Sequence, residues 1–318
     1  MCGIVGAISE RNIEKVLIEG LKRLEYRGYD SAGLALLNAH KKIERIRTQG
    51  KVRELENLLS HAALHGKMGI AHTRWATHGA PSEMNAHPFI STDQVALVHN
   101  GIIENHEKLR KKLLEEGYEF QSETDSEIVV HLIHYHFTET NDLLKATQRT
   151  VAELEGAYAL GIMSTEDPHR VIAVRSGAPL VIGLGTNENF FASDTLALGS
   201  QVKEFIYLEE GDIADVTLQS VAIYNAQGER FTRQTHRLDL VTENTDRGEH
   251  RHYMIKEIYD QPRATFANIE DRITKNHLTD SAFGLASKEL FRRAEHIQIV
   301  ACGTSYHAAL VARYWIES

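Results

Sequence analysis

Short apolar runs separated by turn-forming residues fill the stretch from about 156 to 231. They include AYALGIMS, RVIAVR, LVIGLG, NFFASD, FIYLEEGDIADVTL and VAIYNAQGERF, and Gly, Asn or Asp punctuates the series. Runs of this length are typical of strands, and the polar interruptions are typical of hairpin turns. Because an apolar strand face must be covered, so many short strands restrict this part of the chain to packed β layers.

Helical periodicity precedes these strands. Apolar residues at helical spacing predict an amphipathic helix over 13–24, and Asn141 is a candidate N-cap for a later one. Buried strands are predicted by CGIVGAI, LALL and MGIAHTR, and VALVHNGII predicts a strand that meets an Asn-Gly turn. These elements predict an α+β domain that ends near Phe231, with its strands in layers. The further helices are expected at about 104–116, 125–137 and 141–154.

The texture of the chain changes after Phe231. Residues 232–252 are polar, charged and without periodicity, and we expect a linker there. A helix should follow, interrupted near Pro262. The segment HIQIVACGTSYHAALVARYW then predicts a buried strand, a tight turn and an apolar helix, which is how a doubly wound α/β domain begins. Since one strand cannot form a parallel sheet, we expect 253–318 to be the start of a second domain of a longer protein.

Composition narrows the classes of partner. The net charge of -9 and the pI of about 6.1 disfavour nucleic acid and anionic membrane surfaces. No stretch approaches the roughly 20 apolar residues of a membrane span, and the signal-peptide pattern is missing. Cys2 and Cys302 lie in separate glycine-flanked motifs, so we expect two free thiols and a cytoplasmic location.

Cys2 directly follows Met1. Removal of Met1 would give Cys2 both a thiol and a free α-amine, and an amine with a pKa of about 7.7–8.0 is a usable base at neutral pH. A nucleophile and a base on one residue define the N-terminal nucleophile arrangement. Position alone favours a small residue buried in the first strand, so the chemical interpretation depends on further residues.

Other motifs contain the remaining parts of an acyl-transfer site. Asn100 has a side-chain amide and Gly101 an accessible backbone N–H, and such donors stabilise an oxyanion. In AHTRWATHG, Arg74 is a candidate clamp for an α-carboxylate, and in SETDSE, Asp125 is a candidate partner for an α-ammonium. Each has an ordinary alternative: a hairpin turn at Asn100 and Gly101, a surface arginine, and an acid at a helix start.

Two further patterns concern metals and phosphate. His131 and His134 are spaced three residues apart on a predicted helix, with Glu127 one turn earlier, but nothing else supports a metal site, and we expect no metal and no cofactor. The CGTS turn between a strand and a helix could present N–H groups and hydroxyls to a phosphate. A plain turn with Ser305 as the helix N-cap fits the same residues equally.

Five motifs occur in order along the chain: MCGIVGAI, LEYRGYDSAG, AHTRWATHG, VHNGIIEN and SETDSE. Together they resemble the class II glutamine amidotransferases of the N-terminal nucleophile type, and among these the glucosamine-6-phosphate synthases, or glutamine–fructose-6-phosphate aminotransferases (isomerizing). The resemblance runs from Cys2 to about Phe231. It continues through HYMIKEIYDQP into CGTSYHAALVARYW, which is similar to the start of that family's sugar isomerase (SIS) domain. LEYRGYDSAG and CGTS separate the chain from amidophosphoribosyltransferases and asparagine synthetases.

The resemblance implies a four-layer α/β/β/α sandwich for residues 2–231. It implies that Cys2 is the nucleophile with its own amine as base, and that Asn100 and Gly101 form the oxyanion hole. Trp75 would gate the passage of ammonia between two sites. The residues implied to bind L-glutamine are Arg74, Thr77, His78, His87 and Asp125. The residues implied to begin a sugar-phosphate site are Gly303, Thr304 and Ser305.

The activity implied is hydrolysis of L-glutamine to glutamate and ammonia through a Cys2 thioester. In a full-length homodimer the ammonia would be transferred to fructose 6-phosphate to make glucosamine 6-phosphate for hexosamine biosynthesis. The family's remaining isomerase residues, including a Schiff-base lysine, would lie beyond Ser318, so we expect this chain to be a glutaminase only. The alternatives are a catalytically silent amino-acid or sugar-phosphate sensor and an enzyme with a different acceptor.

Overall fold

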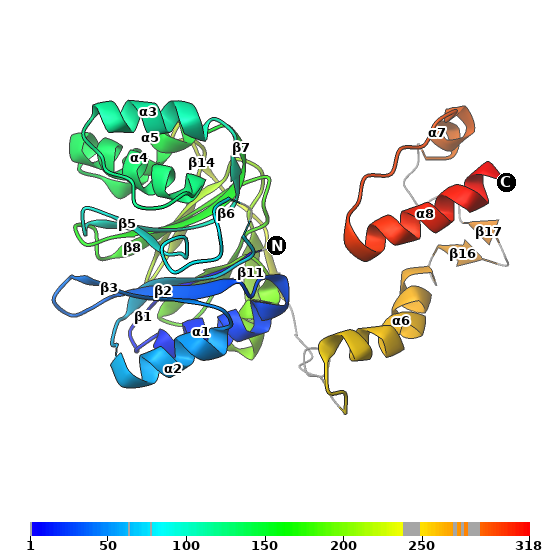
Figure 1. The fold of residues 1–318 in the computed structure, drawn as a ribbon, viewed down its shortest axis with the longest axis horizontal. Helices are drawn as coiled ribbons and strands as arrows, with labels where there is room; N and C mark the ends of the chain where they lie inside the picture. The colour runs from blue at the N-terminus through cyan, green and yellow to red at the C-terminus, as the bar shows by residue number, and fades with distance from the viewer. Residues whose placement is uncertain are drawn as a thin grey trace. The chain divides into compact units, whose positions relative to one another are not determined.

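The computed structural model describes residues 2–62, 64–76, 78–237, 249–269, 272–274, 277–278 and 287–318. The chain divides into two compact units, Met1–Thr245 and Asp246–Ser318, which we describe separately (Figure 1). No helix in these residues is long and apolar enough to cross a membrane.

Two antiparallel sheets form the centre of the first unit. The strands of the eight-stranded sheet are β1 (Gly3–Ser9), β2 (Ser31–Leu37), β3 (Ile43–Gln49), β4 (Met68–Arg74), β9 (Val181–Leu184), β10 (Glu188–Ala192), β11 (Glu204–Tyr207) and β15 (Thr235–Arg237). Their order across the sheet is β15-β11-β9-β10-β1-β4-β2-β3. The strands of the seven-stranded sheet are β5 (Phe89–Ser91), β6 (Val95–Ile103), β7 (Gly156–Ser164), β8 (Arg170–Ser176), β12 (Ile213–Thr217), β13 (Val221–Tyr224) and β14 (Arg230–Phe231). Their order is β14-β13-β12-β8-β7-β6-β5.

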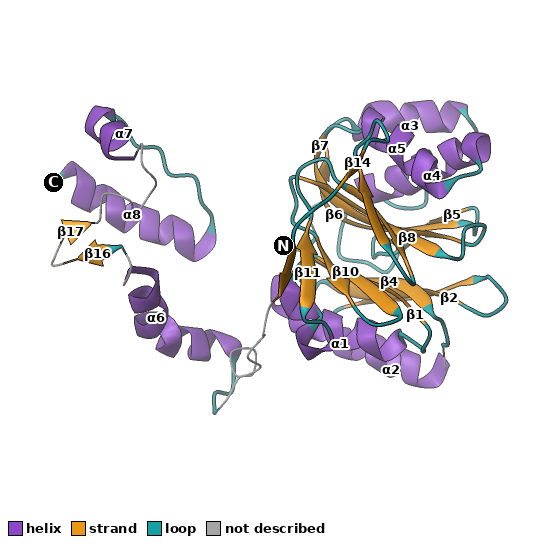
Figure 2. Ribbon diagram, turned by 180° about the vertical axis from the view of Figure 1, so that it is seen from behind, coloured by secondary structure: helices purple, strands orange, loops and turns teal. Residues whose placement is uncertain are grey.

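Helices cover the outer face of each sheet, as Figure 2 shows. Against the eight-stranded sheet lie α1 (Glu14–Leu24) and α2 (Val52–Ala62). Against the seven-stranded sheet lie α3 (His106–Glu115), α4 (Asp125–Thr140) and α5 (Leu143–Glu153). Short 3₁₀ turns occur at η1 (Glu25–Arg27), η2 (Thr195–Ala197) and η3 (Gly199–Gln201). The four layers confirm the expected α/β/β/α sandwich.

Three apolar clusters fill the spaces between these layers. Strand alternation decides which cluster a side chain joins. On β4, Ala71 packs toward α1 and α2, whereas Ile70 packs between the sheets, so His72 and Arg74 also face the inter-sheet layer. On β6, Val98 packs between the sheets. Polar side chains thus occupy one end of an otherwise apolar layer.

Two local expectations were wrong. The Asn-Gly step does not form a turn, because β6 continues through it and pairs Asn100 with Ala159 and Gly101 with Tyr158. Asn141 does not cap α5: it ends α4 at a φ of +49°. Asp142 caps α5 instead, because its carboxylate accepts from two backbone N–H groups of the first turn.

The segment expected as a linker contains an ordered strand. Within 232–252, β15 pairs with β11, with Phe205 opposite His236. The eight-stranded sheet therefore includes residues that follow Phe231 in the chain. Residues 238–248 lie outside the described residues.

The second unit contains α6 (Tyr253–Ile269), β16 (Ile273–Thr274), β17 (His277–Leu278), α7 (Ser287–Arg293) and α8 (Gly303–Glu317). The expected interruption of α6 is wrong, because the helix runs through Pro262. Pro262 has no backbone N–H to donate to the carbonyl oxygen of Ile258, four residues earlier in the helix. Ile258 is exposed, so water can take the place of that donor.

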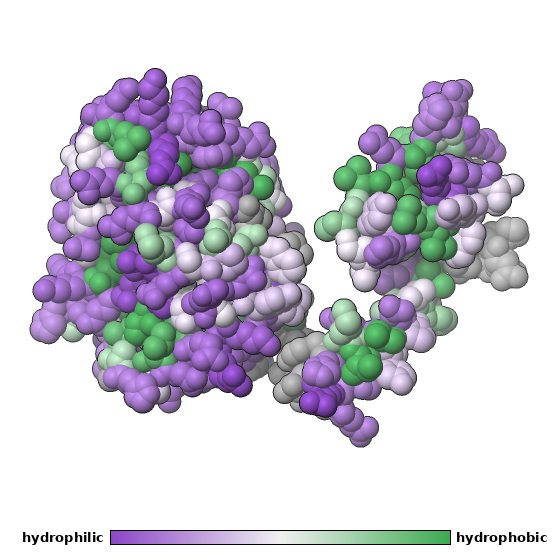
Figure 3. Space-filling model, viewed as in Figure 1, coloured by the Kyte–Doolittle hydropathy of each residue, from purple (hydrophilic) through white to green (hydrophobic). Residues whose placement is uncertain are grey.

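The buried strand expected before the CGTS turn is missing. Ile297, Ile299 and Val300 are not in a strand, and their exposed fractions are 61%, 50% and 87%. A strand requires a neighbour to bond its backbone, and the described part of this unit offers none there. Helix α8 forms but buries none of its residues, and Figure 3 shows apolar side chains on the surface of this unit.

Candidate active site

The candidate site lies where β1, β4 and β6 bring polar residues together. Cys2 immediately precedes β1, and β1 pairs with β4 so that Gly3 lies opposite Thr73. Thr73 is followed by Arg74 and Trp75, which places both close to Cys2. Asn100 reaches the same place from β6 in the other sheet, because its amide nitrogen lies 3.2 Å from the carbonyl oxygen of Cys2.

The Cys2 thiol is half-buried and contacts the backbone of Trp75. The Trp75 N–H donates to Sγ at 3.2 Å. Burial raises the pKa of Cys2, although this N–H and the charge of Arg74 act in the opposite direction. The thiol is therefore protonated at neutral pH and needs a base before it can act as a nucleophile.

Gly101 has a backbone conformation that only glycine tolerates. Its φ is +120°, and an added Cβ would lie 2.0 Å from the carbonyl oxygen of Ala157. No side chain fits in that space. The strand pairing with β7 therefore fixes the backbone of Gly101 next to Asn100.

The Arg74 guanidinium is buried beneath the loop that follows β4. It donates to the carbonyl oxygens of His78, Gly79 and Ala80. Burial lowers the pKa of Arg74, and the negative charge of Asp125 acts against that shift. The alternative of a solvated surface arginine is wrong, because Arg74 is only 4% exposed.

Asp125 is the first residue of α4 but does not cap it. Thr124 is the N-cap and accepts from the Glu127 N–H. Asp125 Oδ2 instead accepts from the Ile103 N–H at 2.9 Å, which ties the start of α4 to β6 just after Gly101. Its side chain is buried next to the oxyanion motif, where an ordinary solvated acid would not lie.

The other residues that the resemblance implies, three for glutamine and Trp75 for ammonia gating, occupy different environments. His87 is buried, with Nε2 3.0 Å from Ser126 Oγ, and burial holds its pKa well below the usual value. The ring of His78 meets that of His106 edge-on at 5.6 Å. Trp75 is 45% exposed and meets the Tyr29 ring at 5.5 Å. Thr77 lies outside the described residues.

The CGTS residues lie in the second unit. Gly303 starts α8, and Thr304 and Ser305 are exposed in its first turn. The alternative of Ser305 as N-cap is wrong, because the N-cap is Cys302, which makes no side-chain capping bond.

Sequence reasoning missed three buried polar residues around the site: His72, His99 and Ser126. All three stand within the quoted motifs, but no role was assigned to them. The available signal was strand alternation, because His72 shares the face of Arg74, whereas His99 faces α4, with Nδ1 2.8 Å from Ser126 Oγ.

The two helix histidines considered as metal ligands have other partners. His131 Nδ1 lies 2.8 Å from Ser91 Oγ, and His134 Nδ1 lies 2.7 Å from the Tyr118 hydroxyl. The residues that the structure describes contain no group of three or more His, Cys, Asp or Glu side chains that could hold a metal ion.

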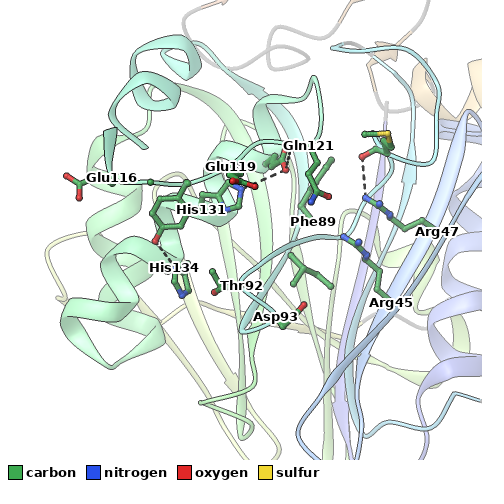
Figure 4. A pocket seen from close by; sticks show the side chains of 15 residues that line it. Arg45, Arg47, Phe89, Thr92, Asp93, Glu116, Glu119, Gln121, His131 and His134 are labelled. Atoms are coloured by element: carbon green, nitrogen blue, oxygen red, sulfur yellow. Dashed lines mark hydrogen bonds and ion pairs between the residues drawn. The ribbon is translucent and has the colours of Figure 1, made fainter. Parts of the chain in front are cut away.

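A cavity of about 570 Å³ lies beside α4, and its lining does not include Cys2. Figure 4 shows Arg45 and Arg47 on one side of it and His131 and His134 on the other. Arg47 donates to the carbonyl oxygens of Met84 and Ala86, and Arg45 to that of Pro88. The two arginines therefore hold the segment that carries His87.

Residues 72–200 match the family described as "Glutamine amidotransferase domain". The chain carries a glutamine amidotransferase domain. The match spans Arg74, Asn100, Gly101 and Asp125 and begins after Cys2.

Relatives extend the similarity over the whole chain. This chain is 54% identical over 318 residues to "Glutamine--fructose-6-phosphate aminotransferase [isomerizing]" of Pseudomonas aeruginosa, and the match covers 100% of this chain and 52% of that protein. It is 51% identical over 318 residues to the protein of the same name from Legionella pneumophila (strain Lens), covering 100% of this chain and 53% of that protein. The chain spans about half the length of the curated relatives it matches.

A solved structure supports the sandwich fold. A glutamine phosphoribosylpyrophosphate amidotransferase from B. subtilis, complexed with ADP and GMP, superposes with a TM-score of 0.59 at 26% identity. The match covers 75% of this chain and 50% of that one.

Proposed function

We propose that this chain hydrolyses L-glutamine to glutamate and ammonia, with Cys2 as the nucleophile. The observation that carries the proposal is the convergence of two donors on Cys2. The Trp75 N–H donates to its sulfur, and the Asn100 amide donates to its carbonyl oxygen. The amidotransferase match and the names of the relatives support glutamine as the substrate.

The proposed reaction starts with removal of Met1. The free α-amine of Cys2 takes the thiol proton, and the thiolate attacks the amide carbon of glutamine. The Asn100 amide and the Gly101 N–H stabilise the oxyanion of the tetrahedral intermediate. The proton returns to the leaving nitrogen, ammonia departs, and water hydrolyses the γ-glutamyl thioester to glutamate and free thiol.

Glutamine is held by its two charged ends. Asp125 binds the α-ammonium, and Arg74 binds the α-carboxylate with a part of its guanidinium that the loop carbonyls leave available. Thr77, His78 and His87 complete the glutamine site, and Trp75 gates the passage of ammonia. The burial of Arg74 and Asp125 supports these roles, because desolvation strengthens the interaction with opposite charges.

The rest of the chain belongs to the wider proposal. The amidotransferase domain predicted for residues 2–231 extends to 237, because β15 pairs within its sheet. The rest of the predicted linker runs to 252, and residues 253–318 are the start of a sugar isomerase domain in which Gly303, Thr304 and Ser305 begin a sugar-phosphate site. In the full protein, a cytoplasmic homodimer, ammonia passes to fructose 6-phosphate and gives glucosamine 6-phosphate. The names of the relatives support this acceptor.

The test measures glutamate release by the purified chain and by Cys2→Ala. Loss of the nucleophile should reduce the rate at least about 10³-fold. Cys302→Ala is the matched control, because it removes the other thiol of the chain and should keep the parental rate. Glutamine binding without glutamate release by the parent would instead show a silent sensor, and an unchanged rate in Cys2→Ala would overturn the nucleophile assignment.

A further inference from the structure

His72 joins the two sheets at the candidate site. It lies on β4, is 1% exposed, and places Nε2 2.9 Å from Oδ1 of Asn100 on β6. The reaction proposed above gives His72 no task. A buried polar group in such close contact with an oxyanion donor can determine how that donor points.

The neighbours of Asn100 fix which atom of His72 carries a proton. Asn100 faces the carbonyl oxygen of Cys2 at 3.2 Å, and because a carbonyl only accepts, the amide nitrogen must lie on that side. The amide oxygen then faces His72, so Nε2 of His72 must be the donor. Nδ1 of His72 is buried and makes no hydrogen bond of ordinary geometry among the described residues, although the backbone of His99 also acts on the ring.

The ring of His72 is neutral near pH 7. Burial lowers its pKa to about 3, although the bond to Asn100 acts in the opposite direction. A neutral ring with its proton on Nε2 can donate to Asn100 and adds no charge to the site. His72 therefore suits orientation of the amide and does not suit proton transfer at neutral pH.

The orientation of the Asn100 amide decides the sign of its effect. With Nδ2 toward Cys2 the amide donates to a developing oxyanion, and with Oδ1 there it would repel the same charge. We infer that His72 is a positioning residue whose Nε2–H holds the Asn100 amide with its nitrogen toward Cys2. This inference rests on the proposed glutamine hydrolysis and names a residue that acts through Asn100.

His87 supports the ring of His72. The two ring centroids are 4.0 Å apart with an interplanar angle of 35°. His87 is itself held near Ser126 on α4, so the helix layer restrains the plane of the His72 ring.

The test compares His72→Phe with His72→Gln. Phenylalanine keeps an aromatic ring but removes the donor, whereas glutamine can place an amide N–H near the position of Nε2. We expect His72→Phe to lower kcat for glutamate release about 10²-fold with KM within about threefold, and His72→Gln to recover most of that loss. His134→Phe, which removes a buried histidine from α4, is the matched control and should keep kcat.

The double variant separates positioning from a general loss of structure. If His72 acts through Asn100, then adding His72→Phe to Asn100→Ala should lower kcat hardly any further. If the two residues act independently, the two reductions in kcat should multiply. Alkylation of Cys2 by iodoacetamide should proceed at the parental rate in His72→Phe, because the nucleophile and its amine are intact. Parental kcat in His72→Phe, or multiplied losses in the double variant, would overturn the inference.

A spectroscopic readout is independent of these variants. Nitrogen-15 NMR of the histidine-labelled parent should show His72 neutral with its proton on Nε2 at pH 7. A proton on Nδ1, or a charged ring, would overturn the inference even if the enzyme hydrolyses glutamine. Failure of the parent itself to release glutamate would instead remove the proposed function, and the two failures are therefore distinguishable.

Discussion

Similar apolar sequence patterns form a buried strand in the first unit of this chain and an exposed irregular segment in the second. In the first, the strand containing Ile162 has neighbours on both edges and cover on both faces, and its side chain is fully buried. In the second, the run containing Ile299 stays outside any sheet and is half exposed. An apolar run thus becomes a strand only when backbone partners exist, whereas helix α8 forms without burying a residue.

The largest expected effect tests this contrast with the same substitution in both units. Ile162→Ala should lower the free energy of unfolding by about 2–5 kcal/mol, because it leaves a cavity between β7 and the helix layer. Ile299→Ala should change it by less than about 0.5 kcal/mol, because it removes little packing. Urea unfolding followed by fluorescence measures both. Similar losses in the two variants would break the comparison.

A smaller effect sharpens the comparison within the first unit. Gly101→Ala adds both the strain of a positive φ and a Cβ 2.0 Å from the Ala157 carbonyl oxygen. It should destabilise the unit by about 2–3 kcal/mol and abolish glutamate release. Gly117→Ala is the control, because its φ of +87° imposes strain but no atom lies within 4 Å. It should cost about 1 kcal/mol and keep activity, and equal costs would contradict the close approach at Gly101.

The smallest expected effect is a loss of folding stability at acidic pH, which depends on Glu127. Burial alone would raise the pKa of Glu127, but His131 and the backbone N–H groups of Gln121 and Ser122 outweigh it and lower the pKa to about 2. A carboxyl group whose pKa is lower in the folded than in the unfolded protein stabilises the fold at pH values above its unfolded pKa. That contribution is lost as the pH falls toward the folded pKa.

Stability of the first unit should therefore fall as pH decreases from about 4.5 to 2, and Glu127→Gln should flatten that decline. Urea midpoints measured at each pH, by near-ultraviolet circular dichroism, report the change. An identical acid profile in parent and variant would show that Glu127 does not contribute.

Much of the layered fold could be predicted from the sequence, because strand and helix periodicity are local properties. The strands from β7 to β14 and helices α1, α3 and α4 follow directly from such patterns. The Asn-Gly step was misread because turn propensity is also local, and only the ladder between β6 and β7 keeps Gly101 within a strand. The extra strand β15 depends on pairing with β11, which no local pattern in a polar segment reveals.

The chemical site was less predictable than its parts. Cys2, Arg74, Asn100 and Asp125 could be selected by residue type and motif resemblance. The contact between Asn100 and His72 could not be predicted, because the two residues are 28 positions apart in the sequence and lie in different sheets. The burial of Arg74 beneath its own loop likewise depends on tertiary packing.

The most direct test of the central claim locates the nucleophile. The purified chain is treated with a glutamine analogue that carries an electrophilic carbon in place of the side-chain amide, and the labelled peptide is sequenced by mass spectrometry. The account predicts one label, on the sulfur of Cys2, in a chain that begins at Cys2 because Met1 is gone. A label on Cys302, or a label on Cys2 with Met1 still attached, would contradict it.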